Sequence, residues 1–77
     1  MARDKNNHLK SYKILGKNIK EMRIKNKLSQ ENLAFMLDSA RNYIGCIERA
    51  EKFPSFAFIL DIANALNCKL SDLTKNI

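Results

Sequence analysis

The chain has 77 residues, of which 45% are hydrophobic and 29% charged, and its net charge is +6 at pH 7. The length fits one domain, and the composition excludes a chain that is disordered throughout. No apolar run approaches the roughly 20 residues of a membrane span, and the first ten residues lack the apolar core of a secretory signal, so we expect a cytoplasmic protein.

The positive charge is concentrated near the start of the chain. Residues 1–27 hold nine Lys and Arg against two acidic residues, whereas residues 28–77 hold five against six. A basic balance favours a polyanionic partner such as nucleic acid, although a basic segment is often only a solubilising arm. Residues 1–12 are polar and lack periodicity, which predicts a flexible basic arm.

The domain proper is predicted to span residues 13–77 and to begin with a helix that ends near Asn26. Its apolar residues recur at helical spacing and charged residues fill the other positions. The apolar residues of this stripe are Leu15, Ile19 and Met22.

Two short helices are expected next, with only a few residues between them. Ser29 is a suitable N-cap for the first of them, although Asn32 stands where a full capping box has Glu or Gln. This helix would end at Asp38, and Ser39 would cap the following one. So short a break indicates a helix-turn-helix corner.

Two further helices complete the predicted fold. Pro54 and Ser55 are favourable at a helix start, and Asn67 can end that helix in a left-handed conformation. Ser71 would cap a last short helix. With no strand pattern, the sequence predicts an all-α fold, a compact five-helix bundle.

Three segments resemble the phage-repressor (Cro/XRE-type) helix-turn-helix family, namely LGKNIKEMRIKNKLSQENLA, YIGCIERAEKFPS and ILDIANALNCKLSDL. They cover residues 15–73, and their combination is more specific than any one of them. The resemblance implies a lambda-repressor-like DNA-binding domain. The second helix of the corner would enter the major groove with its N-terminal residues nearest the bases.

The side of that helix opposite Ile44 and Ile47 carries the candidate contacts to bases. Arg41 can donate two hydrogen bonds to guanine, and Asn42 can pair with adenine. A solvated polar helix start is the alternative for both. The weaker candidates at the bases are Ala40, Tyr43 and Cys46, and for Tyr43 packing is nearly as plausible.

Contacts to DNA phosphates are expected around this helix, where the family commonly touches the backbone. Each candidate has ordinary surface as its alternative. The candidates are Gln30, Ser39, Lys52 and Ser55.

The resemblance also implies a structural ion pair between Arg23 and Glu48, which would fix the reading helix to the first helix. Three positions depart from the family pattern. Asp38 and Ala50 stand where glycine is frequent, and alanine in a left-handed conformation would be strained. Gly45 replaces the usual serine on what we expect to be the exposed face.

A single domain of this kind reads about half of a symmetric site, so we expect a homodimer on a (pseudo)palindromic operator in double-stranded DNA. The interface would involve the end of the fourth helix and the fifth helix. Its predicted apolar contacts are Leu70, Leu73 and Ile77. Alternatively, Leu70 and Leu73 only close the core.

The segment ARNYIGCIERAEKF is similar to restriction–modification controller proteins, which are small repressor–activators. We therefore expect a transcriptional regulator, with a prophage repressor or an antitoxin-type regulator fitting nearly as well. A rival hypothesis is a protein-interaction module whose contact patch would be Phe35, Phe53 and Phe56.

Nothing in the sequence favours an enzyme, a metal site or a cofactor. The sole histidine, His8, lies in the predicted arm, and no nucleophile–base set is evident. Cys46 and Cys68 are isolated, which fits two small buried side chains better than a zinc site or a disulfide. We expect no small-molecule ligand.

Overall fold

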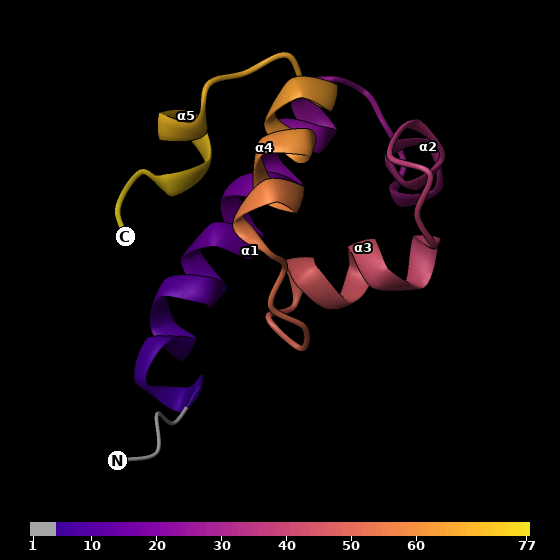
Figure 1. Cartoon of the computed structure of the whole chain (residues 1–77). Coiled ribbons are helices and arrows are strands. Elements are labelled where there is room, and N and C mark those ends of the chain that lie inside the picture. Colours follow the sequence, from indigo (N-terminus) through magenta and orange to yellow (C-terminus); the bar gives the residue numbers. More distant parts are fainter. Residues whose placement is uncertain (1–4) are drawn as a thin grey trace.

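The computed structural model describes residues 5–77 of the chain. Its elements are the 3-10 turn η1 (Lys5–His8) and the helices α1 (Leu9–Lys25), α2 (Gln30–Met36), α3 (Arg41–Glu48), α4 (Phe56–Ala65) and α5 (Leu70–Thr74). Figure 1 shows these helices joined by short connections. Since residues 5–77 contain no strand, the predicted all-α class and the five helices are confirmed.

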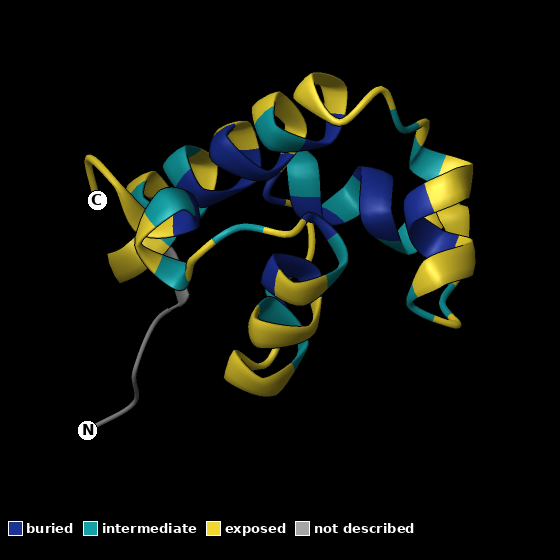
Figure 2. Ribbon diagram, turned by 90° about the horizontal axis from the view of Figure 1, so that it is seen from above, coloured by how far each residue is buried: buried dark blue, intermediate teal, exposed yellow. Residues whose placement is uncertain are grey.

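The long helix α1 organises the arrangement of the others. It packs against α3 on one side and α5 on the other, while α2 packs against α3 (Figure 1). Each helix is buried along one face and exposed along the opposite one (Figure 2). The amphipathic pattern of the sequence is therefore satisfied by a common interior.

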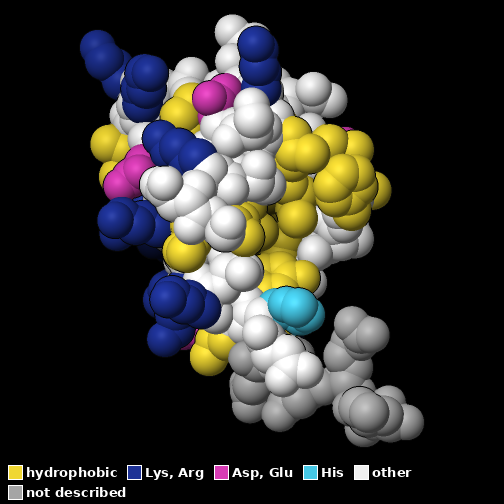
Figure 3. Space-filling model, turned by 90° about the vertical axis from the view of Figure 1, so that its left-hand side faces the viewer, with side chains coloured by type: hydrophobic (Ala, Val, Ile, Leu, Met, Phe, Trp, Pro, Cys, Tyr) yellow, Lys and Arg dark blue, Asp and Glu magenta, His cyan; other side chains and the backbone are white. Residues whose placement is uncertain are grey.

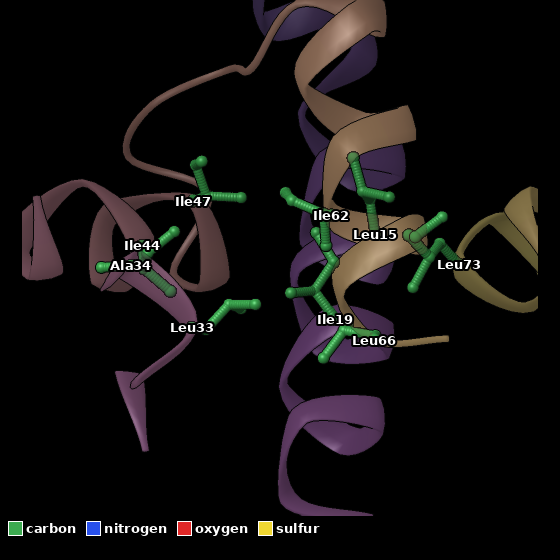
Figure 4. Packing of buried hydrophobic residues seen from close by; sticks show 10 residues of the cluster. Leu15, Ile19, Leu33, Ala34, Ile44, Ile47, Ile62, Leu66 and Leu73 are labelled. Atoms are coloured by element: carbon green, nitrogen blue, oxygen red, sulfur yellow. The ribbon is translucent and has the colours of Figure 1, made fainter. Parts of the chain in front are cut away.

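The core draws apolar side chains from every α-helix. Figure 4 shows them converging from both sides of α1 and α4. The large, almost fully buried ones are Ile19, Leu33, Ile44, Ile62, Leu66 and Leu73. Burying one such side chain contributes about 1.5–3 kcal/mol before entropy is counted. The inner face of α3 is thus held in place, and its outer face needs no packing partner.

The first helix begins earlier than the sequence pattern predicts, at Leu9 instead of Lys13. The reason is tertiary. The ring of Tyr12 packs on Phe53, with centroids 4.4 Å apart, so this turn gains apolar contact from a distant loop. Residues 9–12 therefore belong to the folded domain. For residues 1–4, which lie outside the described range, the flexible arm stays a prediction.

Two helices begin at the serines that the sequence favours. The hydroxyl of Ser55 accepts a hydrogen bond from the backbone N–H of Phe58 at 3.1 Å, as predicted. The hydroxyl of Ser29 likewise accepts from the N–H of Asn32 at 2.9 Å, and the Asn32 side-chain oxygen accepts from the N–H of Ser29 at 3.3 Å. Our expectation that this capping box is incomplete was wrong, because an asparagine side chain still spans the gap.

The caps expected for the other two short helices were also wrong. Ala40, without a side-chain hydrogen bond, is the N-cap of α3. Ser39 instead donates its N–H to the carbonyl of Ala34 at 2.8 Å and so completes the end of α2. Lys69 is the N-cap of α5, and its N–H is bonded to the carboxylate of Asp72 at 2.9 Å.

Four helices end in the same left-handed turn although none uses glycine. After each turn, the next residue donates its N–H back to a carbonyl in the last turn of the helix, which is the Schellman pattern. The left-handed residues are Lys27 (φ 60°), Asp38 (φ 52°), Ala50 (φ 59°) and Asn67 (φ 53°). Ala50 therefore keeps the conformation a glycine would adopt, at a cost of about 1–2 kcal/mol, and the predicted left-handed end at Asn67 is confirmed.

Candidate DNA-binding site

The corner formed by α2 and α3 leaves one edge of α3 free. Ala34 is buried where the two helices meet, and its small side chain permits their close approach. Ile44 and Ile47 point into the core (Figure 4). Arg41 and Asn42, at the start of α3, are exposed. The arrangement presents the N-terminal turn of α3 to a partner.

A buried ion pair holds α3 to α1, as predicted. The guanidinium of Arg23 donates from Nε to Glu48 Oε2 at 2.7 Å and from Nη2 to Glu48 Oε1 at 3.1 Å. Its Nη1 donates to the carbonyl of Leu28 at 2.8 Å. The two side chains are only 10% and 2% exposed. This bidentate geometry fixes the end of α3 relative to α1 and to the approach to α2.

Gln30 extends the same network to the candidate phosphate contacts. Its side-chain amide nitrogen donates to Glu48 Oε1 at 3.0 Å. Because an amide nitrogen carries two hydrogens, one remains for another acceptor. Gln30 is half-buried at the start of α2, so Glu48 orients its side chain before any partner arrives.

Gly45 is placed differently from our prediction, which put it on the exposed face. It is buried, and a Cβ built there would lie 3.0 Å from Nη1 of Arg49 and 3.5 Å from Oε1 of Gln30. Two long side chains therefore lie close over the glycine. The expectation of exposure failed because it considered α3 alone.

The two weaker candidates beyond Asn42 are only partly available. Tyr43 is half-buried, and its ring packs on Phe58 with centroids 5.4 Å apart, so its ring is part of the domain's packing. Cys46 is half-buried with its sulfur 3.9 Å from Nη2 of Arg49. A DNA contact by either residue stays a prediction.

The remaining candidates lie around the same edge. Ala40 and Lys52 are exposed, and Ser39 is half-buried. Ser55 is exposed, but its hydroxyl already accepts the capping hydrogen bond. Its role at a phosphate would therefore depend on donating its own hydroxyl hydrogen.

Arg49 is the residue that the sequence reasoning missed. It stands eight residues after Arg41, on the same helix face, with Gly45 between them. Its guanidinium is exposed and pairs with Glu51 at 3.0 Å. That hydrogen bond raises the pKa of Arg49 and lowers the pKa of Glu51. The spacing of four and eight residues was the signal that could have revealed it.

The predicted dimer contacts divide into one that fails and two that remain. Leu73 is fully buried and closes the core, so it is not available to a second chain. Leu70 and Ile77 line an apolar hollow of about 300 Å³, together with Tyr12 and Phe56. Figure 3 shows hydrophobic side chains gathered on this face of the molecule.

The aromatic patch of the rival hypothesis is also incomplete. Phe35 and Phe56 are 86% and 63% exposed. Phe53 is only half-exposed, because it packs on Tyr12. The three phenylalanines therefore do not form the open patch that we expected.

Two searches of the described residues gave no further site. Within residues 5–77, no cluster of His, Cys, Asp and Glu is suited to hold a metal ion. No described helix is both long and apolar enough to span a membrane.

Comparison with known proteins agrees with this geometry. Residues 19–73 match the helix-turn-helix family (HTH_3). Over 60 residues the chain is 38% identical to the control protein C.SmaI of Serratia marcescens, which covers 78% of this chain and 71% of that protein.

Solved structures show the same fold. The restriction-modification controller protein C.AhdI from Aeromonas hydrophila matches with a TM-score of 0.77 and 35% identity, over 80% of this chain and 94% of that one. The hypothetical transcription factor NHTF from Neisseria matches with a TM-score of 0.79 and 26% identity, over 83% of this chain and 74% of that one.

The fold and the free edge of α3 define a DNA-binding domain of the helix-turn-helix class. Because the family match spans more than half of its length, the chain belongs to the helix-turn-helix family. It is a DNA-binding regulator of transcription, and it is similar to restriction–modification control proteins. The resemblance to Cro/XRE-type regulators noted in the sequence is therefore confirmed.

Proposed function

We propose that the protein is a controller-type regulator of restriction–modification genes that binds a (pseudo)palindromic operator as a homodimer. The observation that carries the proposal is the exposed start of α3, held away from the core by the Arg23–Glu48 pair. The controller role is supported by the similarity to C.SmaI and C.AhdI.

In this proposal Arg41 and Asn42 read bases in the major groove, with Gln30, Lys52, Ser39 and Ser55 as phosphate contacts. Ala40 and Cys46 stay secondary base-reading candidates, as does Tyr43. The protein has no catalytic role and needs no cofactor or small ligand. Its location is the cytoplasm, together with the DNA that it regulates.

Replacing Arg41 by alanine is expected to weaken binding to the preferred operator by about 1–3 kcal/mol and to relax the preference at one base position of each half-site. The cause is the loss of a bidentate contact to a guanine. Fluorescence anisotropy with the operator and with single-base variants measures both effects. A mutant with unchanged base preference would remove Arg41 from the reading role.

A prophage repressor and an antitoxin-type regulator remain alternatives, since they use the same domain. Genes for a methylase and an endonuclease beside this one would favour the controller role. The protein-interaction alternative draws on Phe35, which is 86% exposed on α2. Salt separates it from DNA binding, because phosphate contacts weaken steeply with salt and apolar contacts do not.

The homodimer is supported by the apolar hollow that Leu70 and Ile77 help to line. It lies between the start of α1, the start of α4 and α5. Two such faces related by a two-fold axis would bury each other, and their paired domains would meet half-sites about 34 Å apart.

Replacing Phe56 by glutamate is expected to weaken self-association at least about tenfold, or about 1.4 kcal/mol. A charge would enter the apolar face, yet an acidic residue is well placed in the first turn of α4, so the fold should persist. Sedimentation velocity measures the change. Phe35→Glu, on α2 and outside this hollow, is the matched control. Equal effects of the two variants would contradict the proposed interface.

A further inference from the structure

A second hollow, of about 380 Å³, lies on the outer side of α3. It is lined by Gln30, Arg41, Asn42, Gly45 and Arg49. All the side chains that line it carry hydrogen-bond donors, and two of them are guanidinium groups. None of the lining residues is acidic.

The hollow exists because position 45 has no side chain. Residues 41, 45 and 49 follow one another at intervals of four, so they share one face of the helix. The two arginines stand one turn before and one turn after the glycine. A larger residue at position 45 would occupy the space between them.

The two nearest carboxylates are already engaged with cations. Glu48 is bonded to Arg23 and to Gln30, and its side chain is only 2% exposed. Glu51 pairs with Arg49, but both side chains are more than half exposed. An exposed pair of this kind is weak, so Arg49 can exchange the carboxylate for another anion at little cost.

A phosphate group suits this set of donors. Guanidinium groups bind phosphate oxygens through two parallel hydrogen bonds, and the second amide hydrogen of Gln30 can serve a third. Resting on the proposed DNA binding, we infer that the hollow at Gly45 seats one phosphate of the DNA backbone. Arg49 and Gln30 hold that phosphate, while Arg41 extends past it to the bases.

The test fills the hollow without disturbing the fold. A Cβ at position 45 would meet only the ends of flexible side chains, and alanine favours a helix more than glycine does. Gly45→Ala and Gly45→Leu should therefore keep or raise the melting temperature. Their operator affinity should fall progressively, by about tenfold or more for leucine.

The charge of the bound group is measured by the salt dependence. The logarithm of the binding constant falls with the logarithm of salt by about 0.9 for each phosphate contacted. Gly45→Leu should lower this slope by about one contact per protomer. Arg49→Gln should have the same effect, and the two changes together should cost less than their sum, because they remove one contact.

Asn64→Leu is the control, since it places the same side chain on exposed surface of α4 outside this hollow. It should alter neither affinity nor slope. Wild-type affinity in Gly45→Leu would overturn the inference, and so would a weaker affinity with an unchanged slope, which would mean that an uncharged group occupies the hollow. Failure of the wild-type protein to bind any DNA would refute the proposed function itself, which is a distinct outcome.

Discussion

Arg23→Met is expected to lower the free energy of unfolding by about 3–5 kcal/mol. The side chain of Glu48 is 2% exposed, and it would lose both hydrogen bonds from the guanidinium while keeping its charge in the interior. Only Gln30 would remain as its side-chain partner. Since a domain of this size is stable by about 4–12 kcal/mol in total, urea denaturation should show a large shift.

Two further variants separate this effect from the loss of any surface charge. The double variant Arg23→Met, Glu48→Leu should recover much of the stability, because no buried charge is left without a partner. Glu51→Gln, which breaks the exposed pair with Arg49, should change the unfolding midpoint little. Similar small losses for the buried and the exposed pair would contradict the structural role that we assign to Arg23.

Gly16→Ala is expected to destabilise the protein by about 1–3 kcal/mol, although alanine favours a helix. A Cβ at this position would lie 2.5 Å from the carbonyl oxygen of Glu48 and 2.7 Å from that of Ile47. These are backbone atoms and cannot rotate aside. The variant therefore has to move α3 away from α1, and its DNA affinity should fall as well.

The other glycine supplies the matched control for stability. Gly45→Ala is the same substitution on α3, where the added Cβ meets only side-chain ends. Thermal unfolding of the two variants should shift in opposite directions or leave Gly45→Ala unchanged. If Gly16→Ala were as stable as the wild type, the close approach of α1 and α3 would not be as tight as described.

Features set by periodic patterns and by the family resemblance could be predicted from the sequence. The helices with an apolar stripe were expected, as was the Arg23–Glu48 pair, because the two residues match known family positions. Ser55 was recognised as a cap because capping depends on residues three apart. Such features require no knowledge of distant parts of the chain.

The features that escaped prediction depend on contacts between elements. The earlier start of α1 depends on Tyr12 meeting Phe53, 41 residues later. The narrow space at Gly16 arises only when α3 lies across α1. The caps of α3 and α5 were misplaced because serine preference suggested Ser39 and Ser71, whereas the helix starts follow the tertiary packing.

The candidate site divides in the same way. Exposure of Arg41 and Asn42 was predictable from the helix face opposite Ile44 and Ile47. The burial of Gly45 was not, because it results from side chains at positions 30 and 49 lying close to it. Leu73 illustrates the ambiguity of a terminal apolar residue, which serves either the core or an interface until the packing of α5 is known.

The central claim is that the outer edge of α3 faces DNA, and alkylation of the two cysteines tests it most directly. Cys46 lies on α3 and Cys68 precedes α5, and both are half-exposed. Each thiol is compared with itself, with and without saturating operator DNA, because burial raises the pKa of Cys68. The account predicts that DNA slows alkylation of Cys46 and leaves the rate at Cys68 unchanged. Protection of Cys68 alone, or an unprotected Cys46 in the saturated complex, would contradict it.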